Sequence, residues 1–330
     1  MYSHHTHSGD YSQHGYSPLN DMVERASQLN FKTFCLTEHM PRLSAQYLYP
    51  EEIHSEDAED DVARLLEDWE KFVEHARRIQ LQHKDDPLKI IVGAESESCD
   101  TEQIEYCKSL QERYSHTVKF FVGSVHHVNG IPIDFDSSNW NRALESCGNN
   151  LLQLITRYYE TQYEMLQLLK PKIVGHFDLY KLHLPEDLKV DTESGQVTTA
   201  PAGRHVKDNE IFDLWPSLEQ LVLRNLQFIS DYGGILEVNT SALRKGLQEP
   251  YPGLRICQLN QLHGNGKFVL SDDSHSVDQV GTHYGEAIAF LRDTVKLSQL
   301  HYLQLEGPEE DQLVERTVPI TEIISQFEHI

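Results

Sequence analysis

Short, dense apolar runs alternate along the chain with longer amphipathic segments. Runs such as 31–37 (FKTFCLT), 89–97 (KIIVGAESE) and 119–127 (KFFVGSVHH) are typical of strands buried on both faces. Between them, segments such as 57–81 place apolar residues at helical spacing. Strand and helix alternate about seven times, which favours an α/β fold whose parallel sheet is closed or nearly closed by its crossover helices. The expected strands are 1–7, 31–37, 89–97, 119–127, 172–176, 234–239, 267–271 and 302–305, and the expected helices are 17–29, 57–81, 102–114, 151–169, 211–232, 254–262 and 279–291.

Three segments without a clear period interrupt this alternation. They are 40–56, 130–146 and 184–209, and we interpret them as loops or insertions rather than domain linkers. The sequence contains neither an internal repeat nor a low-complexity linker. The simplest expectation is therefore one domain that spans residues 1–330.

The composition excludes several classes of protein. No stretch approaches the ~18 consecutive apolar residues that a membrane-spanning helix needs. We expect no signal peptide, because histidines begin at position 4 and polar residues follow. The five cysteines are scattered and form no CxxC pair, which is typical of reduced thiols and makes cysteine ligands unexpected. We expect a cytoplasmic protein without membrane contact, and the sequence leaves its oligomeric state open.

The charge balance argues against a long nucleic-acid partner. Acidic residues number 52 and basic residues 28, a formal charge of -24, whereas phosphate backbones are bound by stripes of lysine and arginine. A small anionic substrate remains compatible, because bound divalent ions can reverse the local sign. Histidine is abundant, at 19 of 330 residues, so the positions of the histidines decide what the excess means.

Histidines and two carboxylates fall where predicted strands end. His5 and His7 are spaced i, i+2 and share one face of the first strand, as do Asp273 and His275 after the strand near 270. Taken alone, the stretch 3–15 could equally be a disordered, tag-like tract. The carboxyl ends of barrel strands meet at one rim, however, so these side chains should converge there as transition-metal ligands. The other residues at strand ends are His39, Glu95, His126 and His176.

Six short motifs follow one another in a recognisable order. They are HTH at 5–7, TEH at 37–39, GAE at 93–95, SVH at 124–126, GH at 175–176 and DSH at 273–275. This order and spacing resembles the polymerase-and-histidinol-phosphatase (PHP) superfamily. The longer stretches GDYSQHG, LTEHMPR, VGSVHHVNGIPIDFD, GHFDLYKL, NTSALRK and LSDDSH resemble its fungal histidinol-phosphatases, over nearly the whole chain. The resemblance implies a distorted, TIM-like (βα)7 barrel that holds three divalent metal ions.

The resemblance also implies which residues bind each ion. The first ion would be held by His5, His7, Glu95 and Asp273. Glu95 would bridge to a second ion held by His126 and His176, and the third would take His14, His39 and His275, with Asp10 open as an alternative to His14. Mixed nitrogen and oxygen ligation fits Zn, Mn or Fe, and the sequence does not choose among them. Glu95 and Asp273 are the candidate catalytic residues, as metal bridges or as groups that position the attacking hydroxide.

Neighbouring histidines and carboxylates have more ordinary interpretations. His4 and His127 point to the opposite face of their strands from the adjacent ligands, so we expect them to be packed or to support the site. Glu97 shares the face of Glu95, and we favour a role in orienting ligands. Asp272 could be a turn or cap residue. We expect solvent exposure for the histidines away from strand ends, which are His54, His75, His83, His116, His205, His301 and His329.

The implied chemistry is hydrolysis of a phosphate monoester. Clustered divalent ions lower the pKa of a bridging water and neutralise phosphoryl oxygens, which suits direct in-line attack by metal-bound hydroxide. The sequence shows neither a nucleophile elbow nor a GxxxxGK[ST] phosphate loop. The substrate that the resemblance implies is L-histidinol phosphate, which yields L-histidinol and phosphate in histidine biosynthesis.

Candidate substrate-binding residues lie outside the ligand set. Arg244 follows a predicted strand and resembles the family's phosphate-binding arginine, since its planar guanidinium suits bidentate contact with phosphate. An ordinary helix-surface arginine is the alternative. Lys181 and Arg42 are lesser candidates for the same role. Asp178 and the acidic segment 134–136 are candidates for binding the amine and imidazole of the substrate.

Two other classes of function remain open at this point. One is a PHP nuclease or nucleotide phosphoesterase that uses the same metals, and the acidic composition counts against long nucleic acid but not against a mononucleotide. The other is a non-catalytic metal-binding scaffold. A structural metal site needs no open position and no phosphate-binding cation, so the presence of Arg244 argues against the scaffold.

Overall fold

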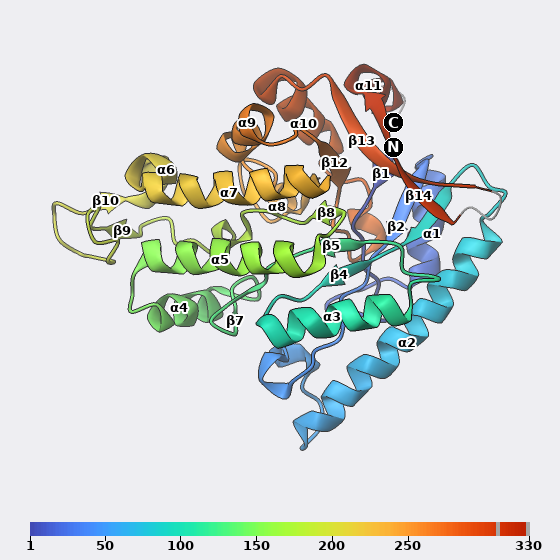
Figure 1. Ribbon diagram of the computed structural model, residues 1–330, viewed down its shortest axis with the longest axis horizontal. Helices are drawn as coiled ribbons and strands as arrows, with labels where there is room; N and C mark the ends of the chain where they lie inside the picture. Colours follow the sequence, from blue (N-terminus) through green and yellow to red (C-terminus); the bar gives the residue numbers. More distant parts are fainter. Residues whose placement is uncertain (308–310, 328–330) are drawn as a thin grey trace.

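Seven parallel strand positions ring the centre of the protein, whose computed structural model describes residues 1–307 and 311–327 (Figure 1). The strands pair in two runs, one in the order β1-β2-β3 and the other in the order β12-β11-β8-β5-β4. Every pairing within these runs is parallel, as the alternation of strand and helix predicts. The bounds are β1 Tyr2–Ser3, β2 Thr33–Leu36, β3 Lys89–Val92, β4 Ala94–Ser96, β5 Phe121–Gly123, β8 Ile173–Val174, β11 Ile235–Asn239 and β12 Phe268–Ser271.

Single backbone bridges join the two runs into a ring. Gly93 separates β3 from β4, which otherwise continue one another along the chain. A parallel bridge between His39 and Glu95 connects the end of β2 to β4. A second parallel bridge, between Thr6 and Ser274, connects the chain beyond β1 to the chain beyond β12. The ring is therefore the distorted (βα)7 barrel that was expected, with its weakest pairing at the ends that carry the histidines.

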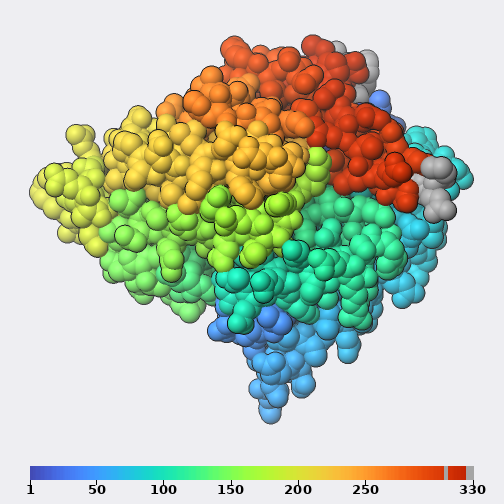
Figure 2. Space-filling model, in the orientation of Figure 1, coloured from blue at the N-terminus to red at the C-terminus, as the bar shows by residue number. Residues whose placement is uncertain are grey.

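Amphipathic helices cover the outer face of the strands, and the side chains of α3, α5 and α7 occupy the middle of the face shown in Figure 2. In α5 the buried residues Leu154, Tyr158 and Met165 recur at helical spacing, so one apolar side of the helix faces the barrel. Among the covering helices, α2, α3 and α5 begin at the side-chain caps Asp57, Asp100 and Asn150. The covering helices are α1 Leu19–Gln28, α2 Ala58–Gln82, α3 Thr101–Arg113, α5 Leu151–Leu169, α7 Pro216–Tyr232, α9 Leu254–His263 and α10 Tyr284–Ala289.

The barrel interior is an apolar cluster closed at one end by a hairpin. The cluster takes one side chain from each of β2, β3, β8, β11 and β12 and two from within or just before β5, and with Leu303 it consists of Cys35, Ile91, Phe120, Val122, Ile173, Ile235 and Val269. Leu303 belongs to β13 (Gln299–Glu306), which pairs in antiparallel fashion with β14 (Gln312–Pro319). Its amide donates to His4 Nε2 at 3.1 Å, just after β1, and its carbonyl accepts from Thr33 Oγ1 at 3.3 Å, at the start of β2. The hairpin therefore seals the amino-terminal mouth and leaves the carboxyl-terminal mouth for function.

The expected irregular segments contain more structure than their sequence indicates. Segment 40–56 holds two 3₁₀ turns, and 184–209 holds a short hairpin of β9 (Lys189–Val190) and β10 (Arg204–His205), which lies at one end of the molecule (Figure 2). Segment 130–146, expected as an insertion without a clear period, contains a strand of a hairpin and a helix. After a hairpin of β6 (His127–Val128) and β7 (Ile131–Pro132), it forms α4 (Ser137–Ser146), capped by Asp136 and packed through Trp140 and Leu144.

Other element boundaries also differ from the expectations. The predicted helix 211–232 is broken into α6 (Ile211–Leu214) and α7, because Pro216 lacks an amide hydrogen and starts a new helix instead. The predicted helix 279–291 shortens to α10, which continues as a π-helical segment over Phe290–Val295. The last strand is longer than 302–305, and neither β14 nor α11 (Ile320–Phe327) was expected.

One surface expectation is wrong. His301 is 9% exposed, and its Nδ1 lies 2.8 Å from Glu315 Oε1 across the β13–β14 hairpin. His301 lies in β13, and the predicted strand 302–305 was too short to include it. Because side chains alternate between the two faces of a strand, its position in β13 explains the burial. His329 lies outside the described residues. Within the parts of the chain that the structure describes, no helix is both long and apolar enough to cross a bilayer.

Candidate metal centre

The residues predicted to meet at the carboxyl ends of the strands do lie together, in and beneath a cavity of about 390 Å³. His5 and His7 follow β1, His39 follows β2, Glu95 lies in β4, His126 follows β5, His176 follows β8, and Asp273 and His275 follow β12. His14 reaches the cavity from the loop between β1 and α1. Residues that are far apart in sequence thus converge because their strands all end at the same mouth.

Glu95 lies at the centre of this group and is 1% exposed. Its two carboxylate oxygens face two different sets of imidazoles. Oε2 lies 3.2 Å from His5 Nε2, 3.3 Å from His7 Nε2 and 3.0 Å from His39 Nδ1, and Oε1 lies 3.2 Å from His126 Nε2 and 3.0 Å from His176 Nε2. One carboxylate can therefore bridge two neighbouring cation positions.

Asp273 approaches the same imidazoles from the carboxyl end of β12. Its Oδ1 lies 3.7 Å from His5 Nε2 and 3.5 Å from His7 Nε2. Its Oδ2 accepts hydrogen bonds of 3.2 Å from both Asn239 Nδ2 and Ser241 Oγ, which fix the orientation of the carboxylate. The backbone of Asp273 is left-handed, with φ of 50°, a conformation that aspartate tolerates better than most residues. The turn after β12 therefore aims this side chain at the histidines.

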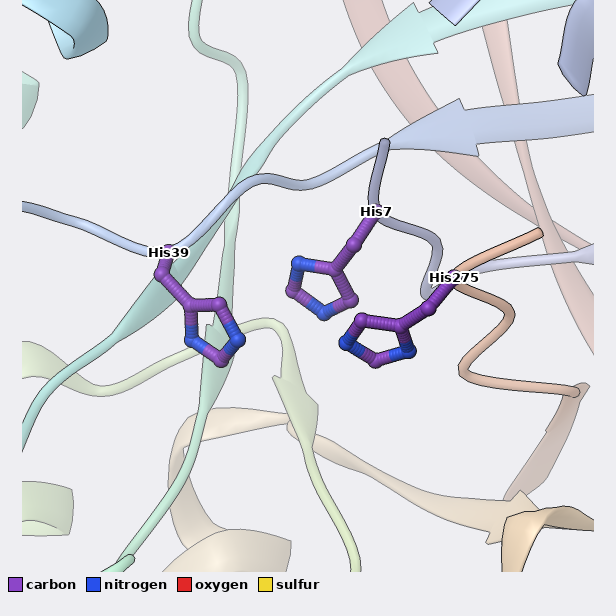
Figure 3. Close-up of side chains that lie close together, drawn as sticks. All are labelled: His7, His39 and His275. Atoms are coloured by element: carbon purple, nitrogen blue, oxygen red, sulfur yellow. The ribbon is translucent and has the colours of Figure 1, made fainter. Parts of the chain in front are cut away.

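Three groups of potential ligand atoms share members and form one continuous centre. They are His7 with His39 and His275 (Figure 3), His5 with His7 and Asp273, and His5 with Glu95 and His176, and the ligand atoms within each group lie within 4.8 Å of one another. The structure places His14 beside the first group, with its Nε2 3.1 Å from His39 Nε2. Nitrogen and oxygen donors in this combination suit Zn, Mn or Fe.

The imidazole nitrogens fit a metal better than they fit one another. His14 Nδ1 lies 2.8 Å from Glu51 Oε1 and His39 Nδ1 lies 3.0 Å from Glu97 Oε1, so each Nδ1 can donate to a carboxylate. The two facing Nε2 atoms then present lone pairs to each other, which a cation between them relieves. Further nitrogens of these imidazoles make no hydrogen bond to the described residues, and they include His5 Nε2, His7 Nε2 and His275 Nε2.

Glu237 is a supporting residue that the sequence did not single out. Its Oε1 lies 2.8 Å from His5 Nδ1, and its Oε2 accepts a 2.7 Å hydrogen bond from the backbone amide of His176. A carboxylate behind a ligating imidazole fixes the tautomer and orientation of the ring and raises its basicity. The available signal was a single acid in the buried run GILEVN, where an unpaired charge would be costly.

Glu97 contacts two of the candidate ligands, as the orienting role favoured for it requires. Its Oε1 lies 3.0 Å from His39 Nδ1, and its Oε2 lies 3.1 Å from His126 Nδ1. Arg42, itself 1% exposed, donates to Oε1 at 2.6 Å. Cys99 and His127 lie close enough to complete a further donor group with Glu97, but both Glu97 oxygens already have partners.

The buried charges shift one another's pKa. Burial alone would keep His5 neutral, but the carboxylates around it, Glu95 first, outweigh burial and raise its pKa well above the usual value. The same competition raises the pKa of His7 to about 10. Burial would in turn raise the pKa of Glu95, but the histidines lower it well below the usual value. In the metal-free chain, protons on the histidines supply the positive charge that balances the buried carboxylates. Divalent cations can replace these protons.

The three candidate phosphate-binding residues lie in different places. Arg244 lines the cavity, and two of its guanidinium nitrogens donate at 2.8 Å to the carbonyls of Asp272 and Asp273. Arg42 lies behind the cavity wall, and Lys181 pairs with Asp178 beside a separate cavity. Lys245, which the sequence analysis passed over, lines the main cavity next to Arg244.

The residues with ordinary interpretations have local roles. His4 Nδ1 lies 2.8 Å from the Leu270 carbonyl, and His127 Nδ1 lies 3.5 Å from Cys99 Sγ, so both are packed. Asp272 accepts hydrogen bonds from Ser3 Oγ at 3.0 Å and the Gly281 amide at 2.7 Å. Asp10 accepts from the Leu19 amide at 2.8 Å at the start of α1, and the structure places His14, not Asp10, against His39.

Comparison with known proteins gives one consistent result. The PHP domain family model matches residues 3–241. A protein of Saccharomyces cerevisiae named histidinol-phosphatase is 45% identical over 329 residues, which cover 98% of both chains. A Schizosaccharomyces pombe protein named "Probable histidinol-phosphatase" is 38% identical over 98% of this chain and 96% of its own. A crystal structure of a candidate histidinol phosphatase from Listeria monocytogenes shares the fold, with a TM-score of 0.64 at 20% identity over 87% of this chain and 99% of its own.

Substitution of Glu237 should weaken metal binding, although Glu237 is not one of the candidate ligands. We expect Glu237→Gln to raise the Kd for zinc by about 10- to 100-fold, because His5 loses its ionised partner. Competition with a chelator of known affinity measures this value. Glu24→Gln on the exposed side of α1 removes the same charge and should leave the Kd unchanged. Equal affinities in all three proteins would remove Glu237 from the support of the site.

Metal affinity should also rise with pH. In the metal-free chain the raised pKa values of His5 and His7 keep protons on nitrogens that must be free to bind a metal. Binding therefore releases protons, and we expect the apparent Kd for zinc to fall roughly tenfold or more per pH unit from pH 6 to 8. The same chelator competition, corrected for the protonation of the chelator, gives the slope. A flat profile would contradict the assigned charge balance.

Proposed function

The chain belongs to the PHP domain family, and on that basis we propose that it is a metal-dependent histidinol-phosphatase. It hydrolyses L-histidinol phosphate to L-histidinol and inorganic phosphate, a reaction of histidine biosynthesis. The observation that carries the proposal is the cavity, where a buried Glu95 surrounded by imidazoles lies beside the cationic side chains of Arg244 and Lys245. Similarity to fungal histidinol-phosphatases along the whole chain supports it.

The donor set supports three divalent ions of Zn, Mn or Fe. One would be held by His5, His7, Glu95 and Asp273, a second by Glu95, His126 and His176, and a third by His14, His39 and His275. The facing lone pairs of His14 and His39 and the unpartnered nitrogen of His275 support the third position. Glu237, Glu97 and Glu51 would hold the rings from behind.

The residues of the chain position the reactants for in-line hydrolysis. When bound, divalent ions lower the pKa of water and neutralise phosphoryl oxygens. Water adds to phosphorus while the bond from phosphorus to the ester oxygen breaks, and the proton that water loses ends on the leaving alkoxide. Asp273 and Glu95 are the carboxylates at the cavity floor that can accept a hydrogen bond from that water. Asn239 and Ser241 keep Asp273 oriented for this task.

Two cationic side chains would bind the phosphate. The guanidinium of Arg244 has five N–H donors, and the two bonds to the carbonyls of Asp272 and Asp273 leave donors for an anion. Arg244 would thus support the metal-binding turn as well as the substrate. The backbone amide of Lys245 donates to the Ser241 carbonyl at 2.8 Å, but its side chain makes no hydrogen bond or ion pair to the described residues, so the ammonium group is available to the phosphate.

We also propose that residues 1–330 act as one PHP unit. The family match ends at 241, but Asp273 and His275 complete the metal centre and Leu303 completes the barrel interior. A protein cut after residue 241 would therefore lack both a ligand pair and part of its core.

Phosphate release from histidinol phosphate tests the function directly. We expect turnover by metal-loaded protein, loss of turnover with a chelator, and recovery when zinc, manganese or iron is restored. AMP and short single-stranded DNA, assayed alongside, should be poor substrates. Glu95→Gln should reduce turnover by more than about 100-fold, since it removes the bridging carboxylate. Preference for AMP or DNA would favour the nucleotide phosphoesterase alternative, and fully loaded protein without any activity would favour a scaffold.

Lys245→Ala should affect the substrate without affecting the metal. We expect KM for histidinol phosphate and the inhibition constant of free phosphate each to rise about 10-fold, because a charge-assisted contact is lost. Metal content by elemental analysis should stay at the value of the unmodified protein. Lys108→Ala, on the exposed side of α3, removes the same charge as a control. An unchanged KM in Lys245→Ala would exclude this residue from phosphate binding.

A further inference from the structure

The wall of the cavity that carries no metal ligands comes from the two segments 40–56 and 130–146. It presents Tyr49, Asp134 and Phe135 to the same space that the metal centre and Arg244 line. Building on the proposed function, we propose that Asp134 binds the ammonium group of the substrate and so selects amino-alcohol phosphates over other phosphate monoesters.

Asp134 is held in place with one carboxylate oxygen left over. Its Oδ1 accepts a 2.9 Å hydrogen bond from the Tyr49 hydroxyl, and its backbone carbonyl accepts one of 3.1 Å from His183 Nε2. Its Oδ2 makes no hydrogen bond to the residues that the structure describes. A fixed carboxylate with a free oxygen, facing a cavity, is suited to a donor that arrives with a ligand.

Tyr49 is itself anchored to the support of the metal centre. The guanidinium of Arg42 lies over the Tyr49 ring, 5.0 Å from its centroid, and the same group pairs with Glu97 at 2.6 Å and Glu52 at 3.3 Å. The backbone amide of Tyr49 donates to Glu52 at 2.8 Å. Arg42 thus serves as a positioning residue, and the distance between Asp134 and the metal centre is set by packed, charged contacts rather than by a loose loop.

The other carboxylates of the cavity are already committed. Glu95 and Asp273 face the imidazoles of the metal centre, and Glu51 lies 2.8 Å from His14 Nδ1. Asp134 is the remaining carboxylate among the described residues that line this space. Its assignment leaves the cavity with a cationic side for phosphate and an anionic group for an amine.

This arrangement matches the chemistry of the substrate. In histidinol phosphate the ammonium group is on the carbon next to the one that carries the ester oxygen, so an anion for it must lie in the same cavity as the phosphate site. The ring of Phe135, whose centroid lies 5.9 Å from that of Tyr49, adds an aromatic surface beside Asp134 for the imidazole. A phosphate ester without the amine would leave Asp134 unpaired when it binds, which costs affinity.

Two substrates and two variants test the proposal. We expect Asp134→Asn to lower kcat/KM for histidinol phosphate by about 10- to 100-fold and to change kcat/KM for 3-(imidazol-4-yl)propyl phosphate, which lacks the amine, by less than about 3-fold. Product inhibition gives a second measure, since the variant should bind L-histidinol more weakly and phosphate equally well. Asp136→Asn is the matched control. Although the sequence also made Asp136 a candidate for the amine, it does not line the cavity and instead caps α4 by accepting from the Asn139 amide at 2.7 Å, a role that asparagine fills equally well.

The outcomes separate this proposal from the function on which it rests. In one outcome, the unmodified protein prefers histidinol phosphate while Asp134→Asn lowers kcat/KM equally for both substrates, or for neither. In that case Asp134 does not bind the amine, and the proposed function stands. If the unmodified protein shows no preference for histidinol phosphate over the amine-free ester, the substrate assignment fails and the role of Asp134 fails with it. Metal content and Tm of each variant show whether a loss comes from misfolding.

Discussion

The mutual compensation of charge around Glu95 is the constraint on which the rest of the structure depends. A carboxylate that is 1% exposed would be strongly destabilising on its own, and so would the imidazolium groups around it. Each becomes tolerable because the other is within about 3 Å. The supporting carboxylates Glu237 and Glu97 add negative charge behind the rings. The negative charge of the buried carboxylates is therefore balanced only when positive charge is added. This makes the centre a binding site for cations.

The two mouths of the barrel differ, and this difference keeps the buried charges at one mouth. The hairpin of β13 and β14 fills the amino-terminal mouth, and Leu303 completes an apolar interior that excludes water beneath the charges. At the other mouth the strands are short, and two of the junctions between them are single bridges, at His39 with Glu95 and at Thr6 with Ser274. Where the backbone is paired only by a single bridge, it can depart from the regular strand conformation and direct side chains toward the metal centre. The left-handed backbone of Asp273 is an example. Regular hydrogen bonding between strands is thus interrupted near the candidate metal ligands.

The sequence predicts the convergence of the ligands because alternation in strands is a strict rule. The i, i+2 spacing of His5 and His7 places both on one face whatever the length of the strand, and the resemblance to the PHP superfamily supplied the grouping. Contacts that depend on tertiary geometry were out of reach. Arg244 stood out by its position after a strand, but the sequence could not show its bonds to carbonyls or that Lys245 shares the cavity. The helix α4 was missed because its cap and apolar stripe are short.

The central claim, that Glu95 joins two cations through its two oxygens, can be measured by anomalous diffraction from crystals of zinc-loaded protein. The account predicts two separate zinc peaks at about 2.0–2.2 Å from Glu95, one shared with His126 and His176 and the other with His5 and His7. Zinc peaks elsewhere in the protein, with Glu95 contacting none, would contradict it.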